Sequence, residues 1–253
     1  MELLHQASEH FFASQDPHPL QYGLEQGNSD FRQDLASFLT NAYKSAPIDP
    51  RLLFVTTGAS AGLDLICSLF TQPGDVIFVE EPSYFLALRI FHDHGLRIVP
   101  VPVDNDGLCI DALEDRVIES RPKLIYIIPT FQNPSGSTLS QDRREILVAL
   151  AERYYVLIVA DEVYHFLAYT QAPPESFATF ADDAKQVISV NSFSKILAPG
   201  LRLGWIHANA NVIERLVTSS LLDSGGGMNP FTSAVVNGLI ESGGLEQNIT
   251  HLR

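Results

Sequence analysis

Short apolar runs alternate with stretches of helical periodicity over most of this 253-residue chain. The runs are rich in β-branched and aromatic residues, which favour strands, and they lie at 52–56, 76–79, 98–101, 124–128, 156–160, 187–190 and 205–207. Apolar residues at helical spacing occupy the intervening segments 60–70, 85–94, 111–119 and 140–154. This alternation predicts an α/β fold of three layers, in which helices cover both faces of a mostly parallel sheet.

The segments on either side of the alternating region are less regular. A helix is predicted at 31–43, after an irregular stretch that contains several prolines. Two further helices are predicted at 212–220 and 230–240, with a flexible run of three glycines at 225–227 between them.

The charge of the chain narrows the classes of partner. Lys and Arg number 16 against 30 Asp and Glu, a formal net charge of −14, which disfavours non-specific attraction to nucleic acid or to a membrane surface. No membrane-spanning run or secretory signal is recognisable, so a cytoplasmic location is expected. Cys67 and Cys109 lie beside apolar residues and predict buried thiols, without the ligand spacing of a metal site.

Polar clusters follow five of the predicted strands, at 58–60, 80–84, 133–136, 161–164 and 192–195. Ligands of parallel α/β sheets bind beyond the carboxyl ends of the strands. The order of the elements therefore places all five clusters at one edge of the sheet. We expect them to form a single ligand site there.

A lysine in the last cluster has the setting of a Schiff-base site. Lys195 follows Ser192 and Ser194, and Arg202 lies seven positions later. A partly desolvated amine can condense with a carbonyl cofactor, while two hydroxyls and a guanidinium suit a phosphate group on that cofactor. From this segment alone, a lysine in a solvated loop is the alternative.

Two further clusters offer groups for an anion and for a cation. Gly58, Ala59 and Ser60, at a strand-to-helix turn, present backbone N–H groups and a helix amino terminus to an anion. A glycine that only permits the turn is the alternative. Asp161 ends a buried strand, where a carboxylate needs a partner. That partner is either a helix that Asp161 caps or a protonated pyridine nitrogen.

The remaining candidates are two tyrosines and an asparagine. Tyr84 can stack on a cofactor ring, although packing in the core or at its rim is the simpler interpretation. Asn133 and Tyr164 supply hydrogen-bond donors for a phenolic oxygen beside the aldehyde. Neither is specific alone, because Asn-Pro-Ser-Gly at 133–136 is also a common turn.

Taken in order, these motifs resemble those of the fold-type I pyridoxal-phosphate enzymes. The similarity is to the class I and II aminotransferases of the aspartate, aromatic, kynurenine and aminoadipate type, and it extends over nearly the whole chain from about Leu20. Its most specific parts are Ser-Phe-Ser-Lys at 192–195 with Arg-Leu-Gly at 202–204, the segment 129–136, and Asp-Glu-Val-Tyr at 161–164.

The resemblance implies pyridoxal 5'-phosphate as the cofactor. Lys195 would bind the cofactor aldehyde and later move a proton between the substrate α-carbon and the cofactor. Asp161 would pair with the pyridine nitrogen, and Asn133 and Tyr164 would contact the ring oxygen. Tyr84 would stack on the ring. The residues that would hold the phosphate are Gly58, Ala59, Ser60, Ser192, Ser194 and Arg202.

The resemblance also implies partners and domains. Tyr22 is similar to the tyrosine that reaches the phosphate of the neighbouring subunit, which implies a homodimer. The substrates would be an amino acid and a 2-keto acid. The chain would divide into an arm with the first helix at 1–50, a pyridoxal-phosphate-binding large domain at 51–229, and the start of a helix at 230–253 that leads to a small domain.

Departures from the family pattern leave other functions open. Family members normally have a longer amino-terminal arm and a small carboxyl-terminal domain, which supplies an arginine for the substrate carboxylate. In addition, Ala59 stands where many relatives have a hydroxyl. One alternative is a truncated, non-catalytic cofactor-binding module, similar to the domain that some transcription regulators carry. The other is a lyase or synthase with the same fold, because the fold does not decide the reaction.

Overall fold

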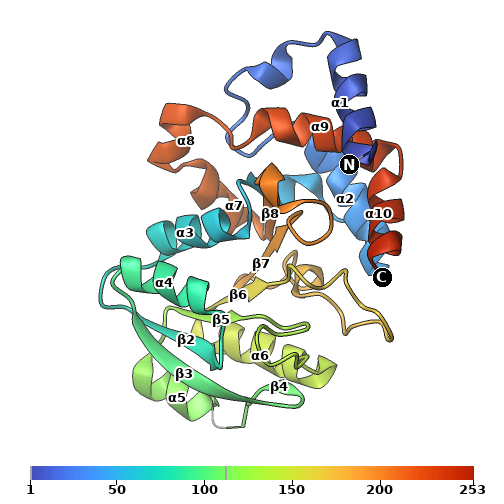
Figure 1. Ribbon diagram of the computed structural model, residues 1–253. Helices are drawn as coiled ribbons and strands as arrows, with labels where there is room; N and C mark the ends of the chain where they lie inside the picture. Colours follow the sequence, from blue (N-terminus) through green and yellow to red (C-terminus); the bar gives the residue numbers. More distant parts are fainter. Residues whose placement is uncertain (1, 112) are drawn as a thin grey trace.

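Eight strands form one sheet in residues 2–111 and 113–253, which the computed structural model describes (Figure 1). Their order across the sheet is β1-β8-β7-β6-β5-β2-β3-β4. The bounds are Leu53–Thr56 (β1), Val76–Glu81 (β2), Arg97–Asp104 (β3), Gly107–Leu108 (β4), Leu124–Ile127 (β5), Leu157–Asp161 (β6), Val187–Ser192 (β7) and Gly204–Ala208 (β8). Every strand predicted from an apolar run is present. Only the short β4, which pairs with β3 in a hairpin, was missed.

The directions of the strands confirm a mostly parallel sheet. β2, β3, β5, β6 and β7 are joined by parallel ladders. β8 departs from this pattern, because it pairs antiparallel with both β1 and β7. β1 therefore runs in the same direction as β7. The carboxyl ends of these parallel strands meet at one edge of the sheet, and the reversed β8 begins at that edge.

Ten α-helices are present in the described residues. Their bounds are Glu2–Ser14 (α1), Ser29–Tyr43 (α2), Ala59–Phe70 (α3), Phe85–Asp93 (α4), Leu113–Ser120 (α5), Gln141–Tyr154 (α6), Ala210–Val217 (α7), Ser220–Gly225 (α8), Pro230–Glu241 (α9) and Gly244–Leu252 (α10). The sequence prediction missed α1 and α10 and joined α7 to the start of α8. The predicted helix at 111–119 is α5, although Ala112 lies outside the described residues.

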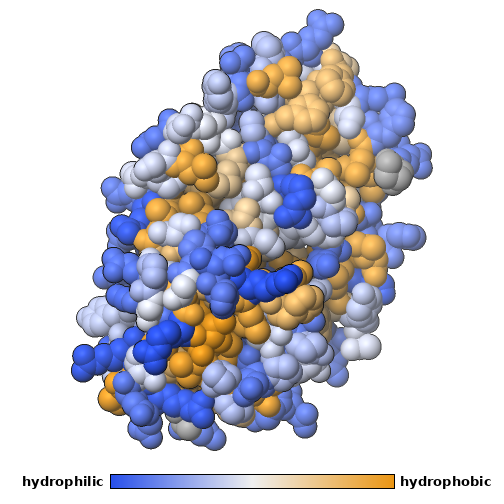
Figure 2. Space-filling view, turned by 60° about the vertical axis from the view of Figure 1, so that its left-hand side comes forward, coloured by the Kyte–Doolittle hydropathy of each residue, from blue (hydrophilic) through white to orange (hydrophobic). Residues whose placement is uncertain are grey.

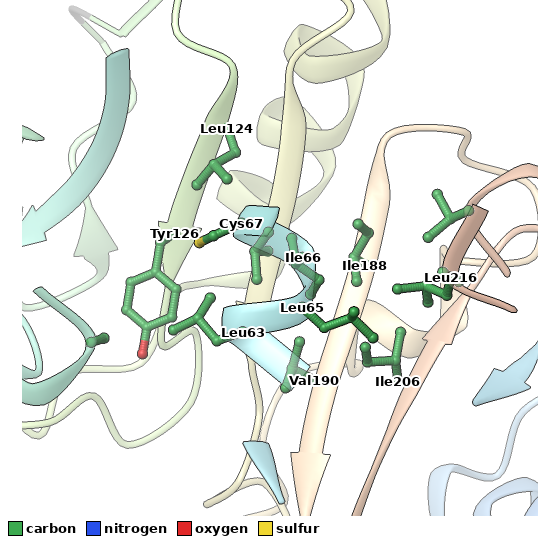
Figure 3. Close-up of a cluster of buried hydrophobic side chains, with 14 of the residues drawn as sticks. Leu63, Leu65, Ile66, Cys67, Leu124, Tyr126, Ile188, Val190, Ile206 and Leu216 are labelled. Carbon is green, nitrogen blue, oxygen red and sulfur yellow. The ribbon is translucent and has the colours of Figure 1, made fainter. Parts of the chain in front are cut away.

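Side chains of the central strands alternate between the two faces of the sheet. On β5, Leu124 and Tyr126 pack in a buried cluster with α3, α4 and α7, while Ile125 and Ile127 pack in a second cluster with α5 and α6. The alternation follows from the two-residue period of a strand. Figure 3 shows α3 on the first face, with its apolar side chains against the strands. The three-layer α/β arrangement is thus confirmed.

Three helices near the chain ends form a further part of the core. Phe31 and Leu35 of α2 pack in one buried cluster with Val236 of α9, Leu245 of α10 and Trp205 of β8. In addition, α1 packs on α9 through apolar residues that lie four apart, at 3, 7 and 11. Residues 230–253 thus share a core with α2, and the division of the chain at 229 stays a prediction.

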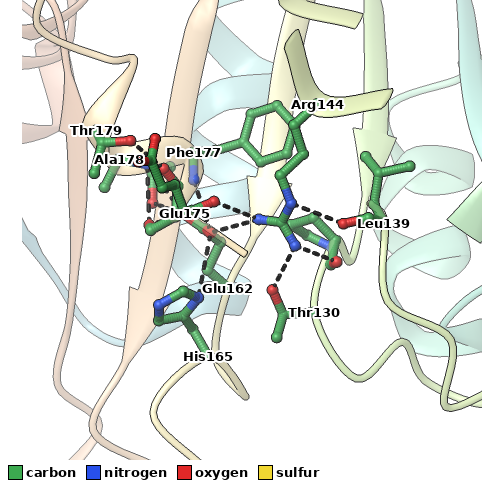
Figure 4. Close-up of polar contacts among 12 residues, drawn as sticks. Thr130, Leu139, Arg144, Glu162, His165, Glu175, Phe177, Ala178 and Thr179 are labelled. Carbon is green, nitrogen blue, oxygen red and sulfur yellow. Dashed lines mark hydrogen bonds and ion pairs between the residues drawn. The ribbon is translucent and has the colours of Figure 1, made fainter. Parts of the chain in front are cut away.

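A buried ion pair connects the loops at the carboxyl edge of the sheet (Figure 4). Glu162, directly after β6, lies 4.0 Å from Arg144 of α6, and both side chains are fully buried. Arg144 also donates hydrogen bonds to Thr130 and to the carbonyls of Pro129, Leu139 and Glu175. Glu162 accepts from the hydroxyls of Ser176 and Ser189 and from the N–H groups of Phe177 and Ala178. Four segments of the chain are therefore held together around two charges.

We expect Arg144→Met to lower the free energy of unfolding by about 3–5 kcal/mol, because it leaves the Glu162 carboxylate buried without its cation. Urea unfolding followed by circular dichroism measures the change. Arg153→Met is the matched control. Arg153 lies 2.7 Å from Glu114, but both side chains are exposed, so its loss costs at most about 1 kcal/mol. Equal costs for the two substitutions would contradict this account of the buried pair.

Candidate active site

A cavity of about 280 Å³ opens at the carboxyl edge of the sheet. It brings together most of the residues that the sequence singled out. The predicted residues that line it are Ala59, Ser60, Tyr84, Asn133, Asp161, Tyr164, Ser192, Ser194, Lys195 and Arg202. Gly58 lies directly behind this lining, because a Cβ atom at Gly58 would be 2.9 Å from Arg202 Nη2. Tyr22 lies outside the cavity, and 78% of its surface is exposed.

The reversed strand β8 explains why Arg202 reaches this cavity. Gly204, the first residue of β8, pairs with Thr56 at the end of β1 and with Ser192 at the end of β7. Arg202 precedes Gly204 by two residues and is thereby held between the loops that follow β1 and β7. A parallel β8 would have placed its first residue at the opposite edge of the sheet.

One end of the cavity is suited to bind a phosphate group. Gly58 caps the start of α3 with a φ of 98°, and no side chain occupies the cap, so the first N–H groups of α3 can bind an anion. Ser192 and Ser194 add two hydroxyls, whose oxygens lie 2.9 Å apart. The exposed Arg202 has no carboxylate within 4.0 Å among the described residues. Its positive charge is therefore available to a ligand.

Asp161, the last residue of β6, presents a carboxylate that is only partly satisfied. Its Oδ2 accepts a hydrogen bond of 2.9 Å from the hydroxyl of Tyr126, whereas its buried Oδ1 has no partner in the part of the chain that is described. Burial raises the pKa of Asp161 to about 6, against the opposing effects of the Tyr126 hydroxyl, the Val163 N–H and the Lys195 amine. The alternative role as a helix cap is excluded, because a turn follows β6.

Lys195 lies in the turn after β7, and its side chain is exposed. The partial desolvation expected for its amine stays a prediction. The Lys195 Nζ lies 5.9 Å from the centroid of the Tyr164 ring. The amide of Asn133 donates a long hydrogen bond of 3.4 Å to the Tyr164 hydroxyl. These three side chains thus meet across the cavity from the loops after β5, β6 and β7.

Tyr84 lies half-buried at the start of α4, where its ring packs against the apolar cluster on that face of the sheet. It also contributes to the wall of the cavity. The packing interpretation is therefore correct, and stacking on a ring stays a prediction.

Sequence reasoning assigned no role to three residues that support the site, although one of them, Glu80, belongs to the polar cluster at 80–84. Tyr126 lines the cavity beside Asp161. Glu80, near the end of β2, is 2% exposed and accepts hydrogen bonds from the Ile128 N–H and the Gln132 amide. Gln132 in turn adjoins Asn133, so Glu80 supports the loop that carries it. The sequence held a signal for Glu80, because an acidic residue at the end of an apolar strand needs a partner. Asp161 has the same position at the end of its strand.

Comparison with known proteins identifies the family. Residues 3–223 match the profile of the aminotransferases of class I and II. The chain belongs to this family. The match confirms the family to which the motifs were likened and is consistent with the α/β fold of the chain.

The relatives include enzymes of several substrate types. The chain is 36% identical over 236 residues to aromatic-amino-acid aminotransferase 1 of Thermococcus litoralis, a match that covers 91% of this chain and 56% of that protein. A crystal structure of the Pyrococcus horikoshii kynurenine aminotransferase in complex with PMP has a TM-score of 0.91 and 31% identity, over 100% of this chain and 63% of the other.

A third match carries a phosphopyridoxyl ligand. Alpha-aminoadipate aminotransferase from Thermus thermophilus, complexed with N-(5'-phosphopyridoxyl)-L-leucine, has a TM-score of 0.88 and 28% identity, over 100% of this chain and 63% of that one. The chain spans about half the length of the curated relatives it matches.

Other kinds of site receive no support from residues 2–111 and 113–253. No group of His, Cys, Asp and Glu in this range could hold a metal ion, and none of its helices is long and apolar enough to cross a membrane. Both cysteines are free thiols. Cys67 is buried as predicted, but Cys109 is only half-buried, because it lies at the surface beside the hairpin of β3 and β4.

Glu80 should make the free energy of unfolding depend on pH. Burial raises its pKa from 4.5 to about 8, although the Ile128 N–H and the Gln132 amide lower it. The folded state therefore binds more protons than the unfolded state between these values, and the free energy of unfolding falls as the pH rises through this window, by up to about 1.4 kcal/mol per pH unit. Glu80→Gln should remove that part of the decline.

Urea unfolding of wild type and Glu80→Gln at pH 5 and pH 8.5 measures this effect. The variant should gain stability relative to wild type as the pH rises. Glu119→Gln, at an exposed position of α5, is the control and should leave the difference between the two pH values unchanged. Parallel pH dependences for wild type and Glu80→Gln would show that Glu80 keeps an ordinary pKa in the folded protein.

Proposed function

We propose that this chain is the cofactor-binding part of an aminotransferase that moves an amino group between an amino acid and a 2-keto acid. The observation that carries the proposal is the unpaired, buried Oδ1 of Asp161 in the same cavity as Lys195. A buried carboxylate oxygen without a partner is costly. A protonated ring nitrogen from a ligand would satisfy it, and the neighbouring amine supplies the nucleophile.

The cofactor is pyridoxal phosphate, and the cavity fits its different parts. The start of α3, Ser192, Ser194 and Arg202 would hold the phosphate. Asp161 would accept from the pyridine nitrogen. Asn133 and Tyr164 would donate to the ring oxygen, and Tyr84 would cover one face of the ring. When bound, the cofactor supplies an aldehyde and an electron-withdrawing ring that stabilises negative charge at the substrate α-carbon.

The side chains of this chain would perform the remaining tasks. The Asp161 carboxylate holds the proton on the ring nitrogen, because an anion beside a cationic nitrogen favours its protonated form. The amine of Lys195 would accept the proton from the substrate α-carbon and return it elsewhere in the reaction. Cover from a second subunit or a further domain would exclude water from this amine, which is exposed in the single chain.

We expect pyridoxal phosphate to attach to Lys195. After incubation and borohydride reduction, mass spectrometry of peptides should place the phosphopyridoxyl group on this lysine. Lys195→Ala should abolish the attachment. Lys185→Ala is the matched control, because Lys185 is exposed but lies outside the cavity. Attachment that survives Lys195→Ala, or no attachment in wild type, would contradict the proposal.

The reaction is tested by adding single amino acids to the loaded protein. A released 2-keto acid, together with the aminated cofactor, supports amino-group transfer. A loaded protein that releases nothing is the non-catalytic module. Ammonia or a decarboxylated product would instead identify a lyase of the same fold.

We also propose that two chains form a homodimer. Figure 2 shows apolar side chains exposed on the face that carries α3, α4 and α8. Phe85 of α4 is 65% exposed and Leu221 of α8 is 63% exposed. The arm before α2 adds Tyr22 and Leu24, and it lies along the glycines after α8, as the hydrogen bond between Gly227 and Gly23 shows. Exposed apolar side chains that gather on one face are typical of protein interfaces. A cytoplasmic location, testable by cell fractionation, also stays a prediction.

Light scattering should give about twice the mass of one chain. If Tyr22 reaches the partner's phosphate, Tyr22→Phe should keep the dimer but weaken pyridoxal-phosphate binding roughly tenfold, the effect of one hydrogen bond to a charged group. Tyr155→Phe is the control, because Tyr155 is 82% exposed at the opposite edge of the sheet. A monomer at micromolar concentration, or a Tyr22→Phe variant with unchanged affinity, would refute the shared site.

A further inference from the structure

Tyr126 is a buried tyrosine whose hydroxyl reaches the floor of the cavity. It belongs to the middle of the sheet, since it pairs with Val79 of β2 and with Val159 of β6. Only 1% of its surface is exposed, and the ring of Phe91 packs edge-on against it at 5.2 Å between centroids. Figure 3 shows its hydroxyl beyond the side chain of Leu63, away from the other labelled apolar groups. The ring therefore has little freedom to move.

Because the hydroxyl of Tyr126 binds only one oxygen of Asp161, the two carboxylate oxygens differ in their hydrogen bonding. It donates to Oδ2 at 2.9 Å, whereas Oδ1 is buried without a partner in the described chain. Burial and the adjacent Asp161 and Glu80 carboxylates raise the pKa of Tyr126 well above its usual range. The hydroxyl thus keeps its proton at every ordinary pH and always acts as a donor.

We propose that Tyr126 is a positioning residue that fixes the Asp161 carboxylate through Oδ2, favours its ionised form, and so leaves Oδ1 ready for the ring nitrogen of the cofactor. The proposal extends the proposed function, because the use of Oδ1 rests on pyridoxal phosphate as the ligand. The effect of Tyr126 on Asp161 itself belongs to the chain without cofactor and is measurable there.

The surroundings of Asp161 show why this donor matters. Burial favours its neutral form, and the adjacent carboxylate of Glu162 acts in the same direction. The hydroxyl of Tyr126, the backbone N–H of Val163 and the amine of Lys195 oppose these effects on the pKa of Asp161. The titratable groups around Asp161 are Glu80 on β2, Tyr126 on β5, Glu162 and Tyr164 after β6, and Lys195 after β7. Among them, Tyr126 makes the direct side-chain hydrogen bond to Asp161.

Tyr126→Phe removes the donor and keeps the ring, so the packing against Phe91 is retained. In the protein without cofactor, the pKa of Asp161 should rise by about one pH unit or more, the value of one hydrogen bond to a carboxylate. Carbon-13 NMR of protein labelled at the aspartate carboxyl carbons measures this titration. The signal of Asp161 is assigned by its absence in Asp161→Asn.

Binding of pyridoxal phosphate supplies the second measurement. Asp161 is ionised above about pH 6 in wild type but only at higher pH in the variant. The variant should therefore bind the cofactor up to roughly tenfold more weakly near pH 6, with a ratio to wild type that shrinks at pH 8.5 and above. Calorimetry measures both affinities, and their ratio cancels the titration of the cofactor itself.

Tyr154→Phe is the matched control. The hydroxyl of Tyr154 donates to the carboxylate of Glu114 at 2.7 Å, far from the cavity, so this variant should change neither the titration of Asp161 nor the affinity. A purely structural role for Tyr126 would lower stability in urea but leave the titration of Asp161 as in wild type. That result would overturn the proposal.

Failure of the proposed function has a different signature. If wild type binds no pyridoxal phosphate, the proposed function fails, and with it the use of Oδ1 for the ring nitrogen. If wild type and Tyr126→Phe bind the cofactor equally at every pH and Asp161 titrates alike in both, only the role of Tyr126 fails.

Discussion

The close packing of β8 between β1 and β7 is the constraint on which the cavity depends. At Gly204, a Cβ atom would lie 2.5 Å from the carbonyl oxygen of Asn191 and 2.9 Å from Thr56 Oγ1, so a side chain at this position would force the strands apart. Without it, the three backbones approach closely enough for both ladders to form. The start of β8 then brings Arg202 against the backbone of Gly58, and the end of the cavity that is proposed to bind phosphate results from that contact.

Most buried ionisable side chains at the carboxyl edge find hydrogen-bond partners within the chain, but one oxygen of Asp161 does not. Glu162 and Arg144 form an ion pair that is surrounded by hydrogen bonds. The pair connects the loops after β5 and β6 to α6 and to Ser189 of β7. Glu80 is held by an N–H group and an amide. Asp161, next to Glu162 in the chain, keeps an unpaired oxygen in the cavity. Because unpaired buried carboxylate oxygens are costly, this contrast distinguishes Asp161, whose role in ligand binding is proposed, from the residues that hold the loops.

The elements that the sequence predicted well are those with a strong period. The strands are continuous apolar runs because both faces of the sheet are covered, and helices such as α3 and α4 have clear apolar faces. The missed elements lack these signals. β4 has only two residues, and α1 and α10 each bury only a few side chains, so polar residues occupy most of their positions. Their positions depend on contacts with α9 and α2, which no local pattern reveals.

The sequence by itself determined that the polar clusters gather at one edge of a mostly parallel sheet, because strands that run in the same direction end on the same side. It also indicated Lys195, Asp161 and Arg202 as members of one site. Only the tertiary structure decided that β8 is reversed and that Lys195 is exposed in the single chain. It also decided which oxygen of Asp161 accepts the hydrogen bond from Tyr126. These features depend on the pairing of segments far apart in the sequence and on the space between them, and a sequence pattern encodes neither.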